Sequence, residues 1–188
     1  MGVAQWFRRY AIRSRKKRLI RNKRFHSFDT AKTVGLVFKV TKDVVPPEVL
    51  STMSFLLKKK NVNCTVIGYC DSKTLPETIV NSSLMAVFTK KELNWYGRPV
   101  SDDVKHFLQQ GYDIVIDFCR EADVYPLQYI VSAVQASLII GGVQYAHCPY
   151  DLIVDAQQVC SLEQYVEQIK HYLSIINNPQ SVEQQTKS

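Results

Sequence analysis

The side chains that could do chemistry gather just after the apolar stretches of the sequence, where buried strands are expected to end. Basic side chains at these exits could form an electropositive crevice for a phosphate or a carboxylate. Acidic side chains beside them could act as acids or bases, or as metal ligands. The residues that we assign to this crevice are Lys42, Asp71, Lys73, Lys90, Trp95, Asp117 and Arg120. The competing interpretation, which we favour, is that these are solvated loop side chains and helix caps, so we predict no catalytic residue and no metal ligand.

Two further sets of residues are of types that could do chemistry, but they lack the spacing that this chemistry needs. His147 and Cys148 are adjacent, and neighbours in sequence usually point apart, whereas catalytic partners meet through the fold. The five cysteines include no Cys-x-x-Cys pair, so neither a zinc site nor a disulfide framework is expected. We expect reduced thiols in a cytoplasmic protein.

The stretch NWYGRP at 94–99 places large aromatic side chains in an expected loop. The rings could stack on a base, a sugar or a partner protein. Alternatively Trp95 could plug the edge of the domain, with Gly97 permitting a tight turn. We favour the plug.

The first expected strand is followed by KVTKDVVPPE at 39–48, which contains no glycine. A dinucleotide fingerprint or a phosphate loop needs glycines there, so that backbone amides can approach the pyrophosphate. We therefore predict no cofactor.

The elements that must position these residues alternate between short apolar strands and amphipathic helices. This alternation predicts a three-layer, Rossmann-like α/β domain with a mostly parallel sheet over 30–176. It is preceded by a basic, helical arm over 1–29 and followed by a flexible tail over 177–188. The expected strands are 33–40, 63–70, 84–89, 112–118, 137–142 and 151–156, and the expected helices are 46–60, 74–83, 101–111, 125–136 and 161–176.

Charge is distributed very unevenly along the chain. Residues 1–25 contain ten of the 24 basic residues and none of the 17 acidic ones, which leaves 14 basic against 17 acidic residues elsewhere. Such an asymmetry indicates a polyanionic partner or an anionic surface. The ten cations are Arg8, Arg9, Arg13, Arg15, Lys16, Lys17, Arg18, Arg21, Lys23 and Arg24.

Three uses of this arm compete. It could bind RNA or the ribosome by neutralising phosphates, and become helical only on binding. It could lie on an anionic membrane surface, with Trp6, Phe7 and Tyr10 as a foot. It could also be a solvated segment that packs on its own domain or on a second copy. We expect a non-enzymatic, cytoplasmic binding protein with RNA or ribosome association first and membrane association second. A small enzyme, or a sensor of an anionic metabolite, is the alternative, and no oligomeric state is indicated.

Two resemblances follow from longer motifs. VIGYCDSKTLP, FTKKELNWYGRP, YDIVIDF and QIKHYLSIIN, together with the basic arm, resemble a family of uncharacterised Bacteroidota proteins with a domain of unknown function. The segment at 112–142 is similar to part of the Rossmann-like half of heptosyltransferase-type glycosyltransferases. That similarity implies the fold, but those enzymes also need a second nucleotide-sugar-binding domain, for which we expect no room.

Overall fold

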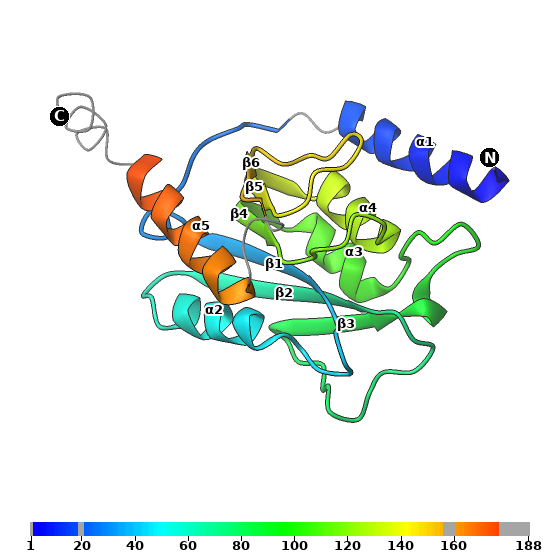
Figure 1. The fold of residues 1–188 in the computed structure, drawn as a ribbon, viewed down its shortest axis with the longest axis horizontal. Coiled ribbons are helices and arrows are strands. Elements are labelled where there is room, and N and C mark those ends of the chain that lie inside the picture. Colours follow the sequence, from blue (N-terminus) through cyan, green and yellow to red (C-terminus); the bar gives the residue numbers. More distant parts are fainter. Residues whose placement is uncertain (1, 19–20, 156–160, 177–188) are drawn as a thin grey trace.

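The centre of the molecule is a six-stranded sheet in which every strand pairs in parallel, in the order β3-β2-β1-β4-β5-β6 (Figure 1). The computed structural model describes residues 2–18, 21–155 and 161–176, with the backbone alone at 15–18 and 176. The parallel α/β sheet and its Rossmann-like strand order confirm the predicted fold class. The strands are β1 (Thr33–Lys39), β2 (Asn63–Cys70), β3 (Met85–Thr89), β4 (Gly111–Asp117), β5 (Gln135–Gly141) and β6 (Leu152–Ile153).

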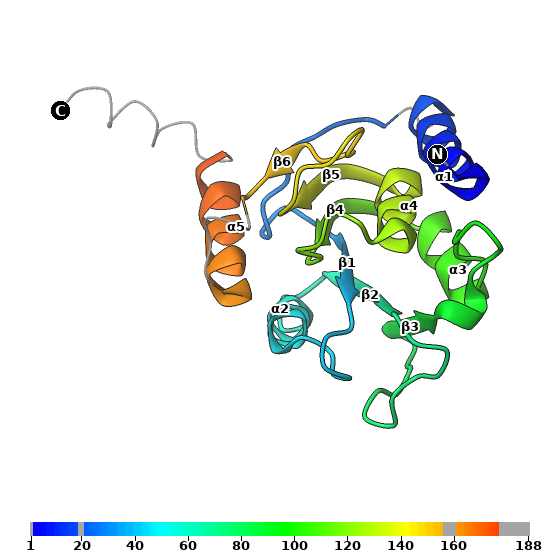
Figure 2. The same cartoon turned by 45° about the vertical axis from the view of Figure 1, so that its right-hand side comes forward.

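Helices cover both faces of the sheet. The helices α2 (Pro47–Leu57) and α5 (Leu162–Ile176) lie on one face, and α3 (Asp102–Gln109) and α4 (Tyr125–Ala133) lie on the other (Figure 2). The side chains of each strand alternate between these two layers. Leu36 and Phe38 pack with the α2 and α5 layer, whereas Val37 packs with the α3 and α4 layer. Both faces are apolar because both are covered, which explains the continuous apolar strands in the sequence.

The N-terminal segment forms the helix α1 (Val3–Arg18), which confirms that the basic arm is helical. It lies along the outer side of α4, as both views show (Figures 1 and 2). Ile12 is only 7% exposed and packs against Tyr125, Tyr129 and Ala133 of α4. In the structure the helix is thus formed without a partner, held by apolar contacts with the domain, although the sequence left open that it becomes helical only on binding.

The segment 74–83, predicted as a short helix, is not helical. Pro76 and a run of β-branched residues disfavour a helix here. Instead the Asn81 side chain bonds the edge strand at Val87: its Oδ1 accepts the amide at 2.9 Å and its Nδ2 donates to the carbonyl at 3.2 Å. Asn81 thus ties the end of this segment to the edge strand β3.

Other boundaries shift by a few residues. The predicted cap at Ser101 is confirmed, since its Oγ accepts the Val104 amide at the start of α3. Gly111 begins β4 rather than ending α3, and α4 ends at Ala133, before the predicted 136. The strand predicted over 151–156 is shortened to Leu152–Ile153, and the predicted tail at 177–188 lies outside the described residues.

Candidate functional site

The outward face of α1 combines aromatic rings with cations. Trp6, Arg9, Tyr10 and Arg13 are spaced by three and four residues, so they share one side of the helix, and all four are exposed. The rings of Trp6 and Tyr10 stack with centroids 5.5 Å apart and planes 8° from parallel. Arg15, Lys16, Lys17 and Arg18 continue the helix, but their side chains lie outside the described part of the chain.

The three aromatic residues predicted to contact a membrane surface, Trp6, Phe7 and Tyr10, do not point the same way. Trp6 and Tyr10 face outward, whereas Phe7 packs inward against Trp95 and Tyr96, with centroids 5.0 and 5.9 Å away. Phe7 therefore attaches the helix to the loop at 94–99. In the described part of the chain, no helix has both the length and the apolar character to cross a membrane.

Arg8 is part of this attachment as well. Its Nε donates to the carbonyl of Tyr96 at 2.7 Å, and its guanidinium lies 5.2 Å from the centre of the Tyr125 ring. Gly97 adopts φ of +90°, and a Cβ there would come within 3.1 Å of the Arg8 guanidinium. The predicted tight turn is confirmed, and it brings the loop backbone close to α1.

Two of the predicted arm cations are neutralised by a carboxylate of the same chain. Arg21 forms a buried ion pair with Asp151, and its Nε donates to the Ala136 carbonyl at 2.7 Å. Lys23 lies 3.0 Å from the same carboxylate. Burial opposes ionisation of Asp151. Hydrogen bonds from the Arg21 side chain, the Ile139 amide and Lys23 outweigh this effect and lower the pKa of Asp151. Arg21 is therefore a structural residue, whereas the ammonium of Lys23 stays largely exposed.

A cavity of about 480 Å³ lies at the carboxyl edge of the sheet, where β1, β2 and β3 end. In open α/β sheets this edge is where ligands bind, near the point at which the strand order reverses, here between β1 and β4. Of the predicted crevice residues, the structure brings Asp71, Lys90 and Trp95 together in its lining. Arg8, Lys39 and Glu121 also line the cavity.

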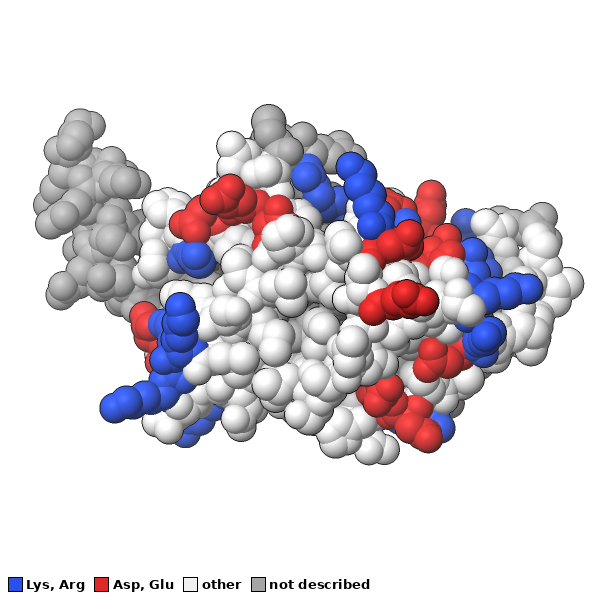
Figure 3. Space-filling view, turned by 90° about the horizontal axis from the view of Figure 1, so that it is seen from below, with Lys and Arg blue, Asp and Glu red and all other residues white. Residues whose placement is uncertain are grey.

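Two of the three cations that line this cavity are paired with acids. Lys39 lies 2.6 Å from Glu121, and Lys90 lies 3.0 Å from Asp71. The hydrogen bond from Lys90 lowers the pKa of Asp71, although burial opposes the shift. Basic and acidic side chains are also intermixed toward the right of Figure 3, the side on which β2 and β3 end in Figure 1. The crevice is therefore close to charge-balanced rather than electropositive.

Three other predicted crevice residues lie outside this lining. Lys42 occupies a tight turn between Thr41 and Val44, with φ of 53°, in place of a phosphate-binding loop. Lys73 and Arg120 are exposed on their loops. Loop residues near strand exits cannot be assigned to one cavity from sequence alone, because the turn geometry decides where each points.

The remaining member, Asp117, is 3% exposed at the end of β4. Its carboxylate accepts the Cys119 amide at 2.8 Å and the Tyr150 hydroxyl at 2.7 Å. Burial raises its pKa to about 6, and these two hydrogen bonds limit the rise. The Tyr150 ring fills the space above Gly141, where a Cβ would approach it to 2.3 Å. Tyr150 therefore plugs the sheet edge beyond β4 and β5.

Trp95, expected to plug the domain edge, is 67% exposed, so that expectation is wrong. Its ring forms a shared wall of the crevice and of a second cavity, which lies between α1 and α4. The sequence reasoning missed Arg98, Tyr125 and Tyr129, which lie at these cavities. The available signal in the sequence was the four-residue spacing of Tyr125 and Tyr129, which places both rings on one face of a helix.

These features define a Rossmann-like α/β domain with a basic, aromatic helix docked on one helical layer. The chain belongs to a family of unknown function, DUF6913, whose model matches residues 5–176. The matched residues begin within α1 and extend to the end of α5. No curated protein and no solved structure matched the chain.

Proposed function

We propose that this is a non-enzymatic binding protein whose helix α1 binds single-stranded segments of RNA, with ribosomal RNA as the first candidate. The observation that carries the proposal is the outward face of α1, on which Trp6 and Tyr10 stack beside Arg9 and Arg13. Single-stranded nucleic acids are bound by such a combination, because bases stack on aromatic rings while cations neutralise phosphates.

The pattern of this face favours RNA over a membrane surface. An interfacial helix separates a continuous apolar face from a basic face. On α1 the aromatic rings and the guanidinium groups alternate on the same side, and Phe7 is turned toward the domain. Burying this face in lipid would also bury Arg9 and Arg13, which is unfavourable.

The strand-edge crevice supports the alternative, a sensor of an anionic metabolite, less well. An anion there would have to compete with Glu121 for Lys39 and with Asp71 for Lys90.

A cytoplasmic location is part of the proposal, since structured RNA is an abundant polyanion there. The Bacteroidota lineage and the heptosyltransferase likeness stay predictions, and the proposal does not depend on either.

The test is equilibrium binding of the full chain to a labelled single-stranded oligouridylate, followed by fluorescence anisotropy at low and high KCl. Replacing both guanidinium groups, in the double variant Arg9→Gln and Arg13→Gln, should weaken binding by about tenfold or more, since one charge-assisted contact contributes roughly 1.5 kcal/mol. Binding should also weaken steeply as KCl rises.

A matched control removes the same charge elsewhere. Lys58 and Lys60 are exposed and follow α2, a helix that lies far from α1 in Figures 1 and 2. The double variant Lys58→Gln and Lys60→Gln should bind RNA like the wild type. Equal losses of RNA affinity in the two double variants would show that only the net charge matters, and would overturn the assignment to α1. Sedimentation with anionic phosphatidylglycerol vesicles, without RNA binding, would replace the proposal with membrane association.

A further inference from the structure

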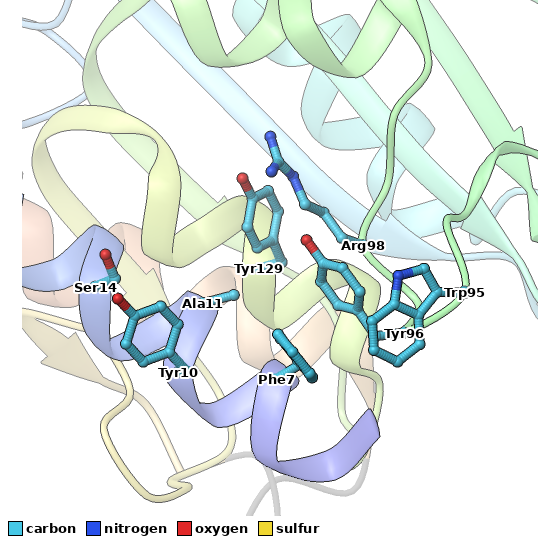
Figure 4. A pocket seen from close by; sticks show the side chains of 8 residues that line it. All are labelled: Phe7, Tyr10, Ala11, Ser14, Trp95, Tyr96, Arg98 and Tyr129. Atoms are coloured by element: carbon cyan, nitrogen blue, oxygen red, sulfur yellow. The ribbon is translucent and has the colours of Figure 1, made fainter. Parts of the chain in front are cut away.

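The exposed rings of α1 are continued by a ring of the loop at 94–99. That loop carries Trp95, which is 67% exposed. Figure 4 shows Phe7 of α1 turned toward the rings of Trp95 and Tyr96, beside the cavity that opens between the helix and the loop. The Phe7 centroid lies 5.0 Å from that of Trp6 and 5.0 Å from that of Trp95, so the two indole rings lie within about 10 Å of each other. Ring contacts therefore join the outward face of α1 to the loop.

Three large rings of this region are open to solvent. Trp6, Tyr10 and Trp95 are each more than half exposed, and we call them the composite aromatic surface. The chain has two tryptophans, and both belong to this surface. A single exposed apolar side chain needs no explanation, but a group of adjacent exposed rings marks an interaction site, because their contact with water is unfavourable. The partner must therefore be able to cover rings on the helix and on the loop together.

The loop that presents Trp95 is fixed by hydrogen bonds on both sides of this residue. The Oδ1 of Asn94 accepts the backbone amides of Tyr96 at 3.3 Å and of Arg98 at 2.8 Å. From the helix, the Nε of Arg8 donates to the Tyr96 carbonyl at 2.7 Å. The backbone that carries Trp95 is thus held both by its own loop and by α1. Little backbone freedom remains to be lost on binding, which favours affinity.

The charge around the composite aromatic surface determines the kind of partner that fits it. Arg9 and Arg13 lie on the same face of α1 as the stacked rings, and the sequence of this helix contains no acidic residue. A neutral apolar segment of another protein would leave these guanidinium groups without anionic partners. A nucleic-acid strand supplies flat rings and negative charges in alternation, so it matches both components of the surface.

We propose that the RNA site is shared between α1 and the domain: the strand held on α1 continues onto the loop at 94–99, where a further base stacks on the exposed ring of Trp95. The inference rests on the proposed function and extends its site beyond the helix. Every base has a flat π face, so stacking on Trp95 selects no particular base. A strand that contacts both segments also favours the docked state of α1, because it binds that arrangement best.

The first test uses the fluorescence of the two tryptophans. Trp6→Phe keeps an aromatic ring on α1 and leaves Trp95 as the single tryptophan of the full chain. Titration of this variant with the oligouridylate should quench the emission of Trp95, because a base stacked on an indole quenches it. The midpoint should agree with that of the anisotropy measurement. Unchanged Trp95 emission, while the anisotropy reports binding, overturns the shared site and leaves the proposed function standing.

The second test is Trp95→Ala, a change at an exposed position that should retain the fold. Oligouridylate binding should weaken about tenfold, as expected for the loss of one stacked base, and its salt dependence should persist because no charge is removed. Tyr172→Ala, which removes a 43% exposed ring from α5, is the matched control and should bind like the wild type. Unchanged affinity in Trp95→Ala, or an equal loss in Tyr172→Ala, overturns the shared site. Failure of the oligouridylate to bind the wild type overturns the proposed function itself.

Discussion

The carboxylate of Asp151 holds the guanidinium of Arg21 in a buried ion pair, although 130 residues separate them in sequence. The pair ties the segment after α1 to the loop that leads into β6. Asp151 also accepts the Ile139 amide at 2.9 Å, so a single carboxylate links the N-terminal segment and the sheet.

Asp151→Asn should therefore lower the free energy of unfolding by about 3 kcal/mol, because it leaves the buried Arg21 without its counter-charge. Chemical denaturation at neutral pH measures this. The pKa of Asp151 is lowered in the folded state, so its contribution is present above the ordinary pKa of aspartate and is lost as pH falls through the lowered value. The difference between variant and wild type should shrink accordingly in acid.

Asp102→Asn supplies the control for this change. Asp102 is almost fully exposed and pairs with Lys105 on the same helix, so its loss should leave the free energy of unfolding essentially unchanged. Similar losses in the two variants would contradict the special role of Asp151.

Asp117 should make the protein less stable as pH rises. Its pKa of about 6 in the folded state lies above the ordinary value of 3.8, so the folded state binds the proton more tightly. This contribution is fully present below pH 3.8 and is lost as pH rises to about 6, with a total of roughly 3 kcal/mol. Asp117→Asn should remove that component, which unfolding titrations from pH 4 to 7 would reveal. An unchanged pH profile in the variant would show that Asp117 titrates normally.

Docking of α1 should depend on Ile12. Ile12→Ala removes buried apolar contacts with α4, at a cost of about 2 kcal/mol or more, which corresponds to roughly a 30-fold larger opening constant for the helix. Trypsin should then cut within α1 faster by a similar factor, because cleavage follows the population of the open form. Val3→Ala, at a position that is 70% exposed, should leave the cleavage rate unchanged. Equal rates for wild type and Ile12→Ala would mean that this contact does not hold the helix.

The salt dependence of RNA binding should report on Arg13 individually. Arg13→Gln should reduce the slope of log affinity against log salt by about 0.7, the value for one phosphate contact on a single strand. A salt titration of the anisotropy measurement gives this slope, and Lys60→Gln should preserve it. A slope that does not change in Arg13→Gln would remove that side chain from the interface.

The sheet and most helices could be predicted because local patterns specify them. The apolar run at 112–118 is buried on both faces, and Ser101 caps α3 through its own hydroxyl. The failure at 74–83 has a physical cause: an Asn81 side chain replaces a strand partner at Val87, and such a tertiary contact leaves no periodic signal.

The candidate site was harder to predict because it depends on pairings between distant residues. Charge density indicated the helix α1, but not that Arg21 would be used internally or that Phe7 would turn toward Trp95. Of the lysines predicted at the strand exits, Lys90 lines the cavity, whereas Lys42 lies in a tight turn outside that lining. Which cation meets which acid follows from the folded chain.

The position of α1 against α4 has a thermodynamic consequence for any partner. The conformational entropy of the sixteen helical residues is lost when the protein folds, and does not have to be lost again on association. Binding through this helix should therefore resemble the meeting of two rigid surfaces, with a small change in heat capacity and an association rate governed by diffusion and long-range attraction.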